Sequence, residues 1–349
     1  MEIVNKEHRK SYLDFLKILA CISVIIMHLC INLNTSFFNW SVNKAFNIIG
    51  NFAVPIFVMV SGALLLNPKK VIKTKNIFLI YIPRLVFSLL IVNMFTVLVN
   101  GIINNNLSSS MFFTSIYGVF LNMVPVPYWY IYMMIGLYLV TPILKEWIKN
   151  ANIKTIEYFL ILFIAYRILA YTILNLPTIE FVSKFNSIYS SFQLPLITGY
   201  CGYYILGYYL TIKDFSKFKN YILLILLFLI EFLTIGLELF FGKHSANYVT
   251  SSTIFSDVFS INIFLISVIL FILAKKTIKN YYKSLTIISN KTYGIYLFHV
   301  LGLNLLSLLN LDTEIPLIYI PLSTILVFTF SYICTFIFQK IPYINKFFR

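Results

Sequence analysis

The sequence predicts an all-helical, polytopic membrane protein with about ten transmembrane helices and both termini in the cytoplasm. Three observations support this fold class. Of the 349 residues, 60% are hydrophobic and 11% are charged, whereas about 25% of the residues in a soluble domain are charged. The apolar residues form stretches of about 20, the length with which a helix crosses a ~30 Å hydrocarbon core. Lysine and arginine gather in every second connection between these stretches, as they do in cytoplasmic loops.

The predicted helices follow one another along the whole chain, which we interpret as a single membrane domain over residues 1–349. Their approximate ranges are 13–32, 46–67, 76–101, 128–147, 157–175, 193–213, 219–241, 256–275, 291–311 and 315–339. The first continues past Cys30 without a signal-peptide cleavage site, so we expect it to remain in the protein. Residues 102–127 have only a short apolar run that ends at Pro125 and Pro127. We interpret them as a loop, although MFFTSIYGVFLNM could form an interfacial helix.

The distribution of positive charge predicts the orientation. With the N-terminus inside the cell, all but six of the 27 lysines and arginines fall in cytoplasmic segments. The six exceptions are Lys44, Lys184 and Lys243 in outer loops, and Lys17, Arg84 and Arg167 within helices. Because the loss of one helix would invert every later loop, this bias supports an even number of helices.

The net charge of +15 does not indicate a nucleic-acid partner, because the basic residues lie in short clusters between apolar runs. The lipid bilayer is the expected surrounding. The chain shows no internal repeat, and its four cysteines have no spacing typical of a metal site or a redox dithiol. We therefore expect no metal.

Ionisable residues within the predicted helices are few, and each is a candidate functional residue. A charged side chain at mid-bilayer costs about 2.5–3.5 kcal/mol even on the mildest scale, so it must face protein or water. The candidates are Asp14, Lys17, His28, Arg84, Arg167, Glu231, Glu238 and His299.

Two of the four arginines, Arg84 and Arg167, lie within predicted helices. A planar guanidinium suits a phosphate or carboxylate partner. Arg84 lies eight residues into an outward-running helix, about 12 Å deep, so it can face a cavity open to the cytoplasm. Arg167 lies near mid-membrane, where it could bind a ligand or form a structural ion pair with Glu231 or Glu238.

Lys17 and His28 share one face of the first helix, about 16 Å apart along its axis. Asp14 lies on the same face and could pair with Lys17. A cation with a deeper imidazole suits a long anionic ligand that enters from the cytosol, and an imidazole can take a proton from a hydroxyl. The alternatives are a lysine that snorkels to the interface and a neutral histidine bonded to a backbone carbonyl.

Two further signals are weak when taken alone. Ser61 and Gly62 place small groups near the cytoplasmic end of the second helix, where they allow close approach of a helix or a ligand. The Tyr-Trp-Tyr cluster at 128–130 favours an aromatic belt at the outer interface over stacking against a sugar.

Four stretches, in order, resemble the acyltransferase 3 family of integral-membrane O-acyltransferases. In YLDFLKILACISVIIMH, Lys17 is followed by ten residues and then His28. VPIFVMVSGALLL is similar to the family's second-helix Ser-Gly-x-Leu-Leu element, YWYIYMMIGLYLVTPIL to its central helix, and ISNKTYGIYLFH to its late tyrosine-rich segment. The likeness covers nearly the whole chain.

The resemblance implies roles for individual residues. His28 would be catalytic, Lys17 its basic partner, and Ser61-Gly62 part of the donor site. Arg84 would match the second arginine of an Arg-x-x-Arg element. Asp14, Tyr81, Arg167 and His299 are possible supporting or acceptor residues.

The sequence departs from the family pattern at two positions. Tyr81 replaces the first arginine of the third-helix element, so Lys70, Lys73 or Lys75 must supply the missing charge or the donor differs. Lys17 replaces a common arginine, which keeps the charge but loses bidentate recognition. The chain also resembles the family members that lack a fused soluble domain.

The resemblance implies an O-acyltransferase that moves an acyl group, commonly acetyl, from cytosolic acyl-CoA to a hydroxyl of a surface or lipid-linked glycan. Acyl-CoA would be a co-substrate and not a tightly bound cofactor. The enzyme would lie in the cytoplasmic membrane of a prokaryote and modify a cell-envelope polysaccharide. We expect a positively lined pocket that opens to the cytosol and ends at His28, which acts as general base or acyl carrier. The alternatives are a secondary transporter or glycan flippase, and a structural membrane subunit, which would leave the buried charges unexplained.

Overall fold

The computed structural model describes residues 9–30, 36–174, 189, 191, 199–244, 255–308 and 315–348, and every regular element within these ranges is helical. Helices occur at all ten predicted places. In chain order they are α1 (Ser11–Leu29), α2 (Phe37–Gly50) with α3 (Ala53–Leu65), α4 (Thr74–Asn76) with η2 (Ile77–Tyr81) and α5 (Ile82–Ile103), η3 (Val126–Tyr128) with α7 (Trp129–Asn150), α8 (Ile153–Phe163) with η4 (Ile164–Leu169) and α9 (Ala170–Leu174), α12 (Tyr200–Ile212), α13 (Asn220–Lys243), α14 (Ile261–Thr277), α16 (Thr292–Leu308) and α17 (Pro316–Phe338).

Seven helical stretches in the described residues are long and apolar enough to cross a membrane. They are 11–29, 37–65, 74–103, 126–150, 153–174, 220–243 and 316–338. The helices α12, α14 and α16 have 13, 17 and 17 residues, and at 1.5 Å per residue none of them alone reaches ~30 Å. The all-helical class is confirmed, while the count of ten and the orientation stay predictions.

The expectation of a loop at 102–127 is wrong, because Ser109–Phe120 forms the helix α6. This helix packs beside α5, where the Asn93 side chain donates a hydrogen bond of 3.0 Å to the Ser115 carbonyl. The helix ends at Phe120, before the prolines, where Asn122 adopts a positive φ of 57° and the Met123 N–H donates a bond of 2.8 Å to the Gly118 carbonyl. Two further short helices are α15 (Lys283–Ser289) and η5 (Asn345–Phe347).

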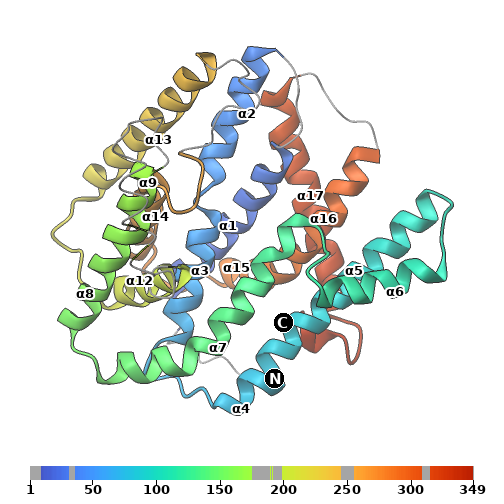
Figure 1. Ribbon diagram of the computed structural model, residues 1–349, viewed down its shortest axis with the longest axis horizontal. Coiled ribbons are helices and arrows are strands. Elements are labelled where there is room, and N and C mark those ends of the chain that lie inside the picture. Colours follow the sequence, from blue (N-terminus) through green and yellow to red (C-terminus); the bar gives the residue numbers. More distant parts are fainter. Residues whose placement is uncertain are drawn as a thin grey trace.

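The helices form a bundle around α1, which contacts α2, α3, α14, α15, α16 and α17. Figure 1 shows α13 and α6 at opposite edges, and α4 at one end of the bundle. At this end, Lys145 donates to backbone carbonyls that follow α3, and Lys275 donates to carbonyls that end α12. Such contacts satisfy the free carbonyls at helix C-termini. We call this the lysine-rich end; it carries the loops predicted to be cytoplasmic.

Gly62 and Gly207 let α3 and α12 touch through their backbones. A Cβ atom at Gly62 would lie 1.8 Å from the carbonyl oxygen of Tyr204, and a Cβ atom at Gly207 would lie 1.8 Å from that of Met59. Gly62 therefore faces a neighbouring helix, which is one of the two roles that its small size allows.

We expect Gly62→Ala to lower the free energy of unfolding by about 3 kcal/mol, because neither backbone can move away without disrupting its helix. Gly236→Ala is the matched control, since a Cβ atom there meets nothing within 4 Å. Thermal unfolding of the two purified variants checks this prediction. Equal midpoints would contradict the close packing of α3 on α12.

Candidate functional site

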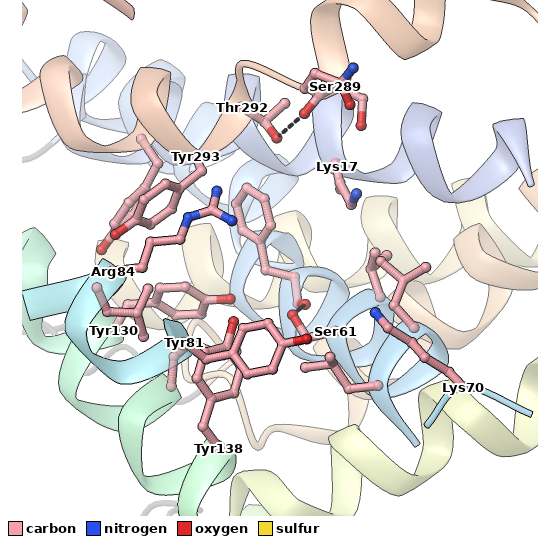
Figure 2. Close-up of a pocket in the computed structure, with 18 residues that line it drawn as sticks. Lys17, Ser61, Lys70, Tyr81, Arg84, Tyr130, Tyr138, Ser289, Thr292 and Tyr293 are labelled. Atoms are coloured by element: carbon pink, nitrogen blue, oxygen red, sulfur yellow. Dashed lines mark hydrogen bonds between the residues drawn. The ribbon is translucent and has the colours of Figure 1, made fainter. Parts of the chain in front are cut away.

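A cavity of about 340 Å³ opens among α1, α3, η2, α5, α7 and the junction of α15 with α16 (Figure 2). Its volume falls in the range of small-molecule sites. The polar residues that line it are Lys17, Ser61, Lys70, Tyr81, Arg84, Tyr130, Tyr138, Ser289, Asn290, Thr292, Tyr293 and Tyr296. The cavity thus combines four of the predicted site residues, Lys17, Ser61, Tyr81 and Arg84.

The lining is strongly positive. It contains Lys17, Lys70 and Arg84, and no acidic side chain is among the described lining residues. Lys70 belongs to the loop after α3, so the cavity extends to the lysine-rich end. An arrangement of three cations in a partly apolar cavity favours a ligand with several negative charges.

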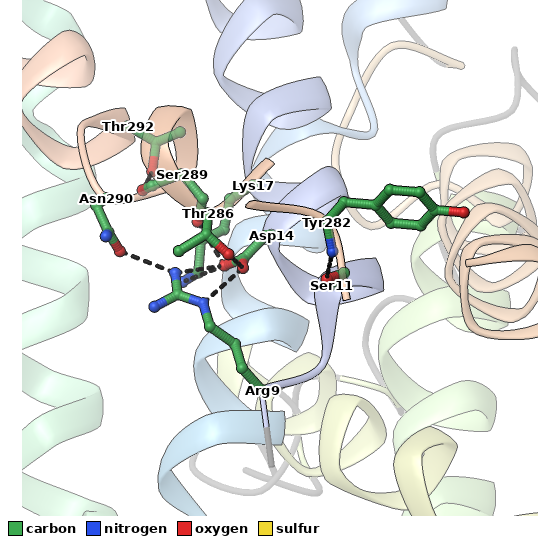
Figure 3. Close-up of polar contacts among 9 residues, drawn as sticks. All are labelled: Arg9, Ser11, Asp14, Lys17, Tyr282, Thr286, Ser289, Asn290 and Thr292. Carbon is green, nitrogen blue, oxygen red and sulfur yellow. Dashed lines mark hydrogen bonds and ion pairs between the residues drawn. The ribbon is translucent and has the colours of Figure 1, made fainter. Parts of the chain in front are cut away.

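Asp14 lies beside this cavity at the centre of a hydrogen-bonded cluster (Figure 3). Its carboxylate accepts bonds of 2.7 and 3.0 Å from Arg9 and one of 2.7 Å from the Ser289 hydroxyl. Lys17 Nζ is 3.9 Å away. The predicted Asp14–Lys17 pair exists, but Arg9 is the closer partner and balances the carboxylate. The charge of Lys17 is therefore available to a ligand.

Arg9 also fixes the far wall of the cavity. Its Nη2 donates a bond of 2.8 Å to the Asn290 side chain, which lines the cavity. Sequence reasoning did not single out Arg9 or Asn290. Asn290 lies in the quoted ISNKTYGIYLFH stretch, which was the available signal. Arg9 gave none, because Asn290, which it holds in the cavity wall, lies 281 residues away in the sequence.

Arg84 follows a π-helical turn at η2, Ile77–Tyr81. Pro83 explains this turn, because it has no N–H to donate to the carbonyl of Leu79 and its ring crowds that turn. The Arg84 guanidinium lies 5.4 Å from the centre of the Tyr293 ring, and the Tyr293 hydroxyl is hydrogen-bonded to Ser88. Arg84 is thus held against the cavity wall.

Tyr81, which replaces an expected arginine, lies in the lining with its ring 5.9 Å from that of Tyr138. It contributes an aromatic surface where the family pattern has a charge. Of the three lysines that could substitute, Lys70 lines the cavity, and Lys73 and Lys75 are not among its lining residues.

Three aromatic rings close the deep end of the cavity. The ring centres of Phe57, Tyr130 and Tyr296 are 5.4 to 6.4 Å apart. Behind them, the His299 ring is 5.4 Å from that of Tyr296, and the His28 ring is 5.4 Å from that of His299. The expectation that the pocket ends at His28 is therefore wrong in this conformation, because Tyr296 and His299 come first.

His299 is fully buried next to His28. Its Nδ1 is hydrogen-bonded to the Tyr296 carbonyl, which only accepts, so Nδ1 carries the proton. Its Nε2 then holds a lone pair, and it has no hydrogen-bond partner in the described part of the chain.

Arg167 does not form the ion pair considered from the sequence. Glu238 instead pairs with Lys44 at 3.2 Å and accepts from the Phe255 N–H, while Glu231 Oε2 has no hydrogen-bond partner among described residues. The Arg167 guanidinium lies over the rings of Phe259 and Tyr171, at 3.8 and 5.1 Å from their centres.

The Tyr-Trp-Tyr cluster is not the interfacial belt that the sequence favours. Tyr128 is fully buried and donates a bond of 2.8 Å to the Leu297 carbonyl, and Tyr130 lines the cavity. Trp129 remains 37% exposed. The reason is that α7 begins inside the bundle, where η3 leads the chain inward past α16.

Comparison with known proteins gives one match. A family model described as an acyltransferase domain matches residues 10–337. No curated protein and no solved structure matches the chain.

Proposed function

Since the chain belongs to the acyltransferase 3 family, we propose that it is a membrane O-acyltransferase that moves an acyl group, acetyl in the simplest case, from cytosolic acyl-CoA to a hydroxyl of a cell-surface or lipid-linked glycan. The single observation that carries the donor part is the cavity lining with Lys17, Lys70 and Arg84 and without a described acidic residue. Acyl-CoA carries a diphosphate and a ribose phosphate, and these are the groups that such cations bind. We place the enzyme in the cytoplasmic membrane of a prokaryote.

In this proposal the phosphates lie at the lysine-rich end, and the thioester points toward Phe57, Tyr130 and Tyr296. Tyr296 is held by a hydrogen bond from its hydroxyl to the Pro127 carbonyl. Release of this bond would let the ring turn away and would open the way to His299 and to His28 beside it. Donor binding supplies the free energy for this change only if the open conformation binds acyl-CoA more tightly than the closed conformation does.

His28 then acts in one of two ways. As a general base it takes the proton of the acceptor hydroxyl while the oxygen attacks the thioester carbonyl; the C–S bond breaks, and the thiolate of CoA takes the proton from the imidazolium. As an acyl carrier its ring nitrogen attacks the thioester carbonyl, the C–S bond breaks, and the thiolate of CoA takes the proton of the other ring nitrogen. The acceptor hydroxyl then attacks the acyl-imidazole, the C–N bond breaks, and the released imidazole takes the hydroxyl proton.

A donor-binding test separates this function from the flippase alternative. Acetyl-CoA and CoA should raise the thermal unfolding midpoint of the purified protein, because a ligand that binds only the folded state stabilises it. The matched control is dephospho-CoA, which lacks the ribose phosphate and should protect less. Absence of any shift at saturating acetyl-CoA would contradict the donor site.

We propose that His299 Nε2, which has no hydrogen-bond partner among the described residues here, accepts a hydrogen bond from His28 in the reacting complex and so orients it. His299→Gln places an amide oxygen near Nε2, whereas His299→Asn replaces only the Nδ1 side of the ring. We expect the Asn variant to lose about tenfold in kcat with an unchanged KM for acyl-CoA, and the Gln variant to keep most of the activity. Equal losses in both variants would assign His299 a purely structural role.

A further inference from the structure

A second polar cluster surrounds Arg167, away from the donor cavity. Arg167 lies in a π-helical turn, η4, about 21 Å along the helix that starts at Ile153 near the lysine-rich end. Figure 1 shows α9, which follows this turn, toward the opposite end of the bundle. π-Helical turns are rare and frequently mark functional sites. Unlike η2, this turn has no proline near it to explain it.

The charge of Arg167 has no counterion within ion-pair distance in the described part of the chain. Its Nε is buried and has no hydrogen-bond partner among described residues. The acidic residue of the nearby loop, Asp257, already accepts the Phe259 N–H at 2.8 Å. The two aromatic rings offset part of the cost of a buried guanidinium, and its remaining donors are suited to an anionic group.

Aromatic rings extend from Arg167 as a connected surface. The Phe259 ring is 4.9 Å from that of Tyr200, and the Tyr200 ring is 5.7 Å from that of Trp129. Trp129 is 37% exposed and Tyr200 is partly exposed. An aromatic surface next to a guanidinium is the combination that holds a sugar ring, whose apolar face packs on the aromatic and whose polar groups take hydrogen bonds.

This surface also reaches the donor cavity. The Trp129 ring lies 6.4 Å from that of Tyr130, which lines the closed deep end of the cavity. A ligand on Trp129 would thus lie one side chain away from the place proposed for the thioester.

We propose that Arg167, Trp129 and Tyr200 form a subsite for a sugar that carries a carboxylate or phosphate group. In the framework of the proposed acyl transfer, on which this role rests, the sugar is the acceptor. The carboxylate would belong to a uronic acid in a glycan, and the phosphate to the head of a lipid-linked sugar.

Binding of glucuronic acid, glucose 1-phosphate and glucose to the full-length protein tests the proposal, with tryptophan fluorescence as the signal. At least one of the two anionic sugars should bind more tightly than glucose, and the preferred one identifies the source of the charge. Arg167→Gln should weaken its binding about 10- to 100-fold, as expected for loss of a charged hydrogen bond. Lys243→Gln removes an exposed cation from the end of α13 and should change nothing. The signal should disappear in Trp129→Phe and remain in Trp147→Phe, which changes the other end of α7.

Two results with the wild-type protein would overturn the subsite: binding of glucose as tight as that of the anionic sugars, or no binding of either anionic sugar. Unchanged binding in Arg167→Gln would do so as well. Thermal protection by acetyl-CoA, measured on the same samples, shows that the variant is folded. If Arg167→Gln does not fold, two other measurements test the subsite. One is the selectivity of the wild-type protein for the anionic sugars over glucose. The other is the affinity of Arg167→Lys for the anionic sugars, since this variant keeps the charge without the planar fork. If acetyl-CoA fails to protect the wild-type protein while an anionic sugar binds, the proposed function fails and the subsite stands.

Discussion

Replacement of His28 by alanine should lower the rate of acyl transfer about 100- to 10,000-fold, the range expected for loss of a general acid–base group. The substitution should leave acetyl-CoA binding intact, because His28 does not line the cavity in which the donor is proposed to bind. Membranes that contain the variant, supplied with labelled acetyl-CoA, would show this loss. Mass spectrometry of surface glycans would show the missing acyl group.

His244→Ala is the matched control for this experiment. His244 follows α13, with its Nδ1 on the Phe240 carbonyl and its side chain exposed, so its removal should not change transfer. Transfer at the wild-type rate in His28→Ala would remove the imidazole from the mechanism. The two roles of His28 can be distinguished by incubation with labelled acetyl-CoA in the absence of acceptor. If the label becomes attached to the wild-type protein and not to His28→Ala, His28 is an acyl carrier and not a general base.

Loss of one cavity cation should weaken acetyl-CoA binding about 10- to 100-fold, because a hydrogen bond to a charged group contributes about 1.5–3 kcal/mol. We expect this for Arg84→Gln, Lys17→Gln and Lys70→Gln. The controls Lys73→Gln and Lys75→Gln should bind normally, since neither residue is among those that line the cavity. Titration calorimetry gives the affinities, and added salt should weaken wild-type binding.

The same variants test whether a lysine compensates for Tyr81, which stands where the family pattern has an arginine. If Lys70 supplies the missing charge, Tyr81→Arg should restore binding in the Lys70→Gln background. A normal affinity in Lys70→Gln together with a weak one in Lys73→Gln would show that another part of the loop binds the phosphates.

Part of the site could be predicted because its signals are local. Lys17 and Arg84 are unusual residues in apolar helices, and helical geometry alone gives their depth. Ser61 was placed in the donor site by the resemblance of its helix to the family pattern. Asp14 was placed beside Lys17 by helical geometry. Its principal partner, Arg9, could not be chosen, because the cluster is completed by Ser289 and Asn290, which only tertiary packing brings to α1.

The remaining differences between the predicted and the observed structure also arise from tertiary packing. From its position near mid-membrane, Arg167 could pair with Glu231 or Glu238, but the fold brings Lys44 to Glu238 and the Phe259 ring to Arg167. The apolar run that became α6 was too short to predict a spanning helix, and it is held by contacts with α5. Aromatic rings separate Lys17 from His28, and their identity depends on how α7 enters the bundle. No local sequence pattern predicts the path of α7.

Protection of a cysteine at position 61 tests the position of the donor most directly. In a background with Cys21, Cys30, Cys201 and Cys334 replaced by alanine, Ser61→Cys provides a thiol in the cavity lining, and Val71→Cys provides one at a position that is 84% exposed. Saturating CoA should slow the reaction of a maleimide with the thiol at position 61 and leave that at position 71 unchanged. Equal rates at position 61 with and without CoA, under conditions in which CoA raises the unfolding midpoint, would show that CoA binds elsewhere and would contradict the donor site.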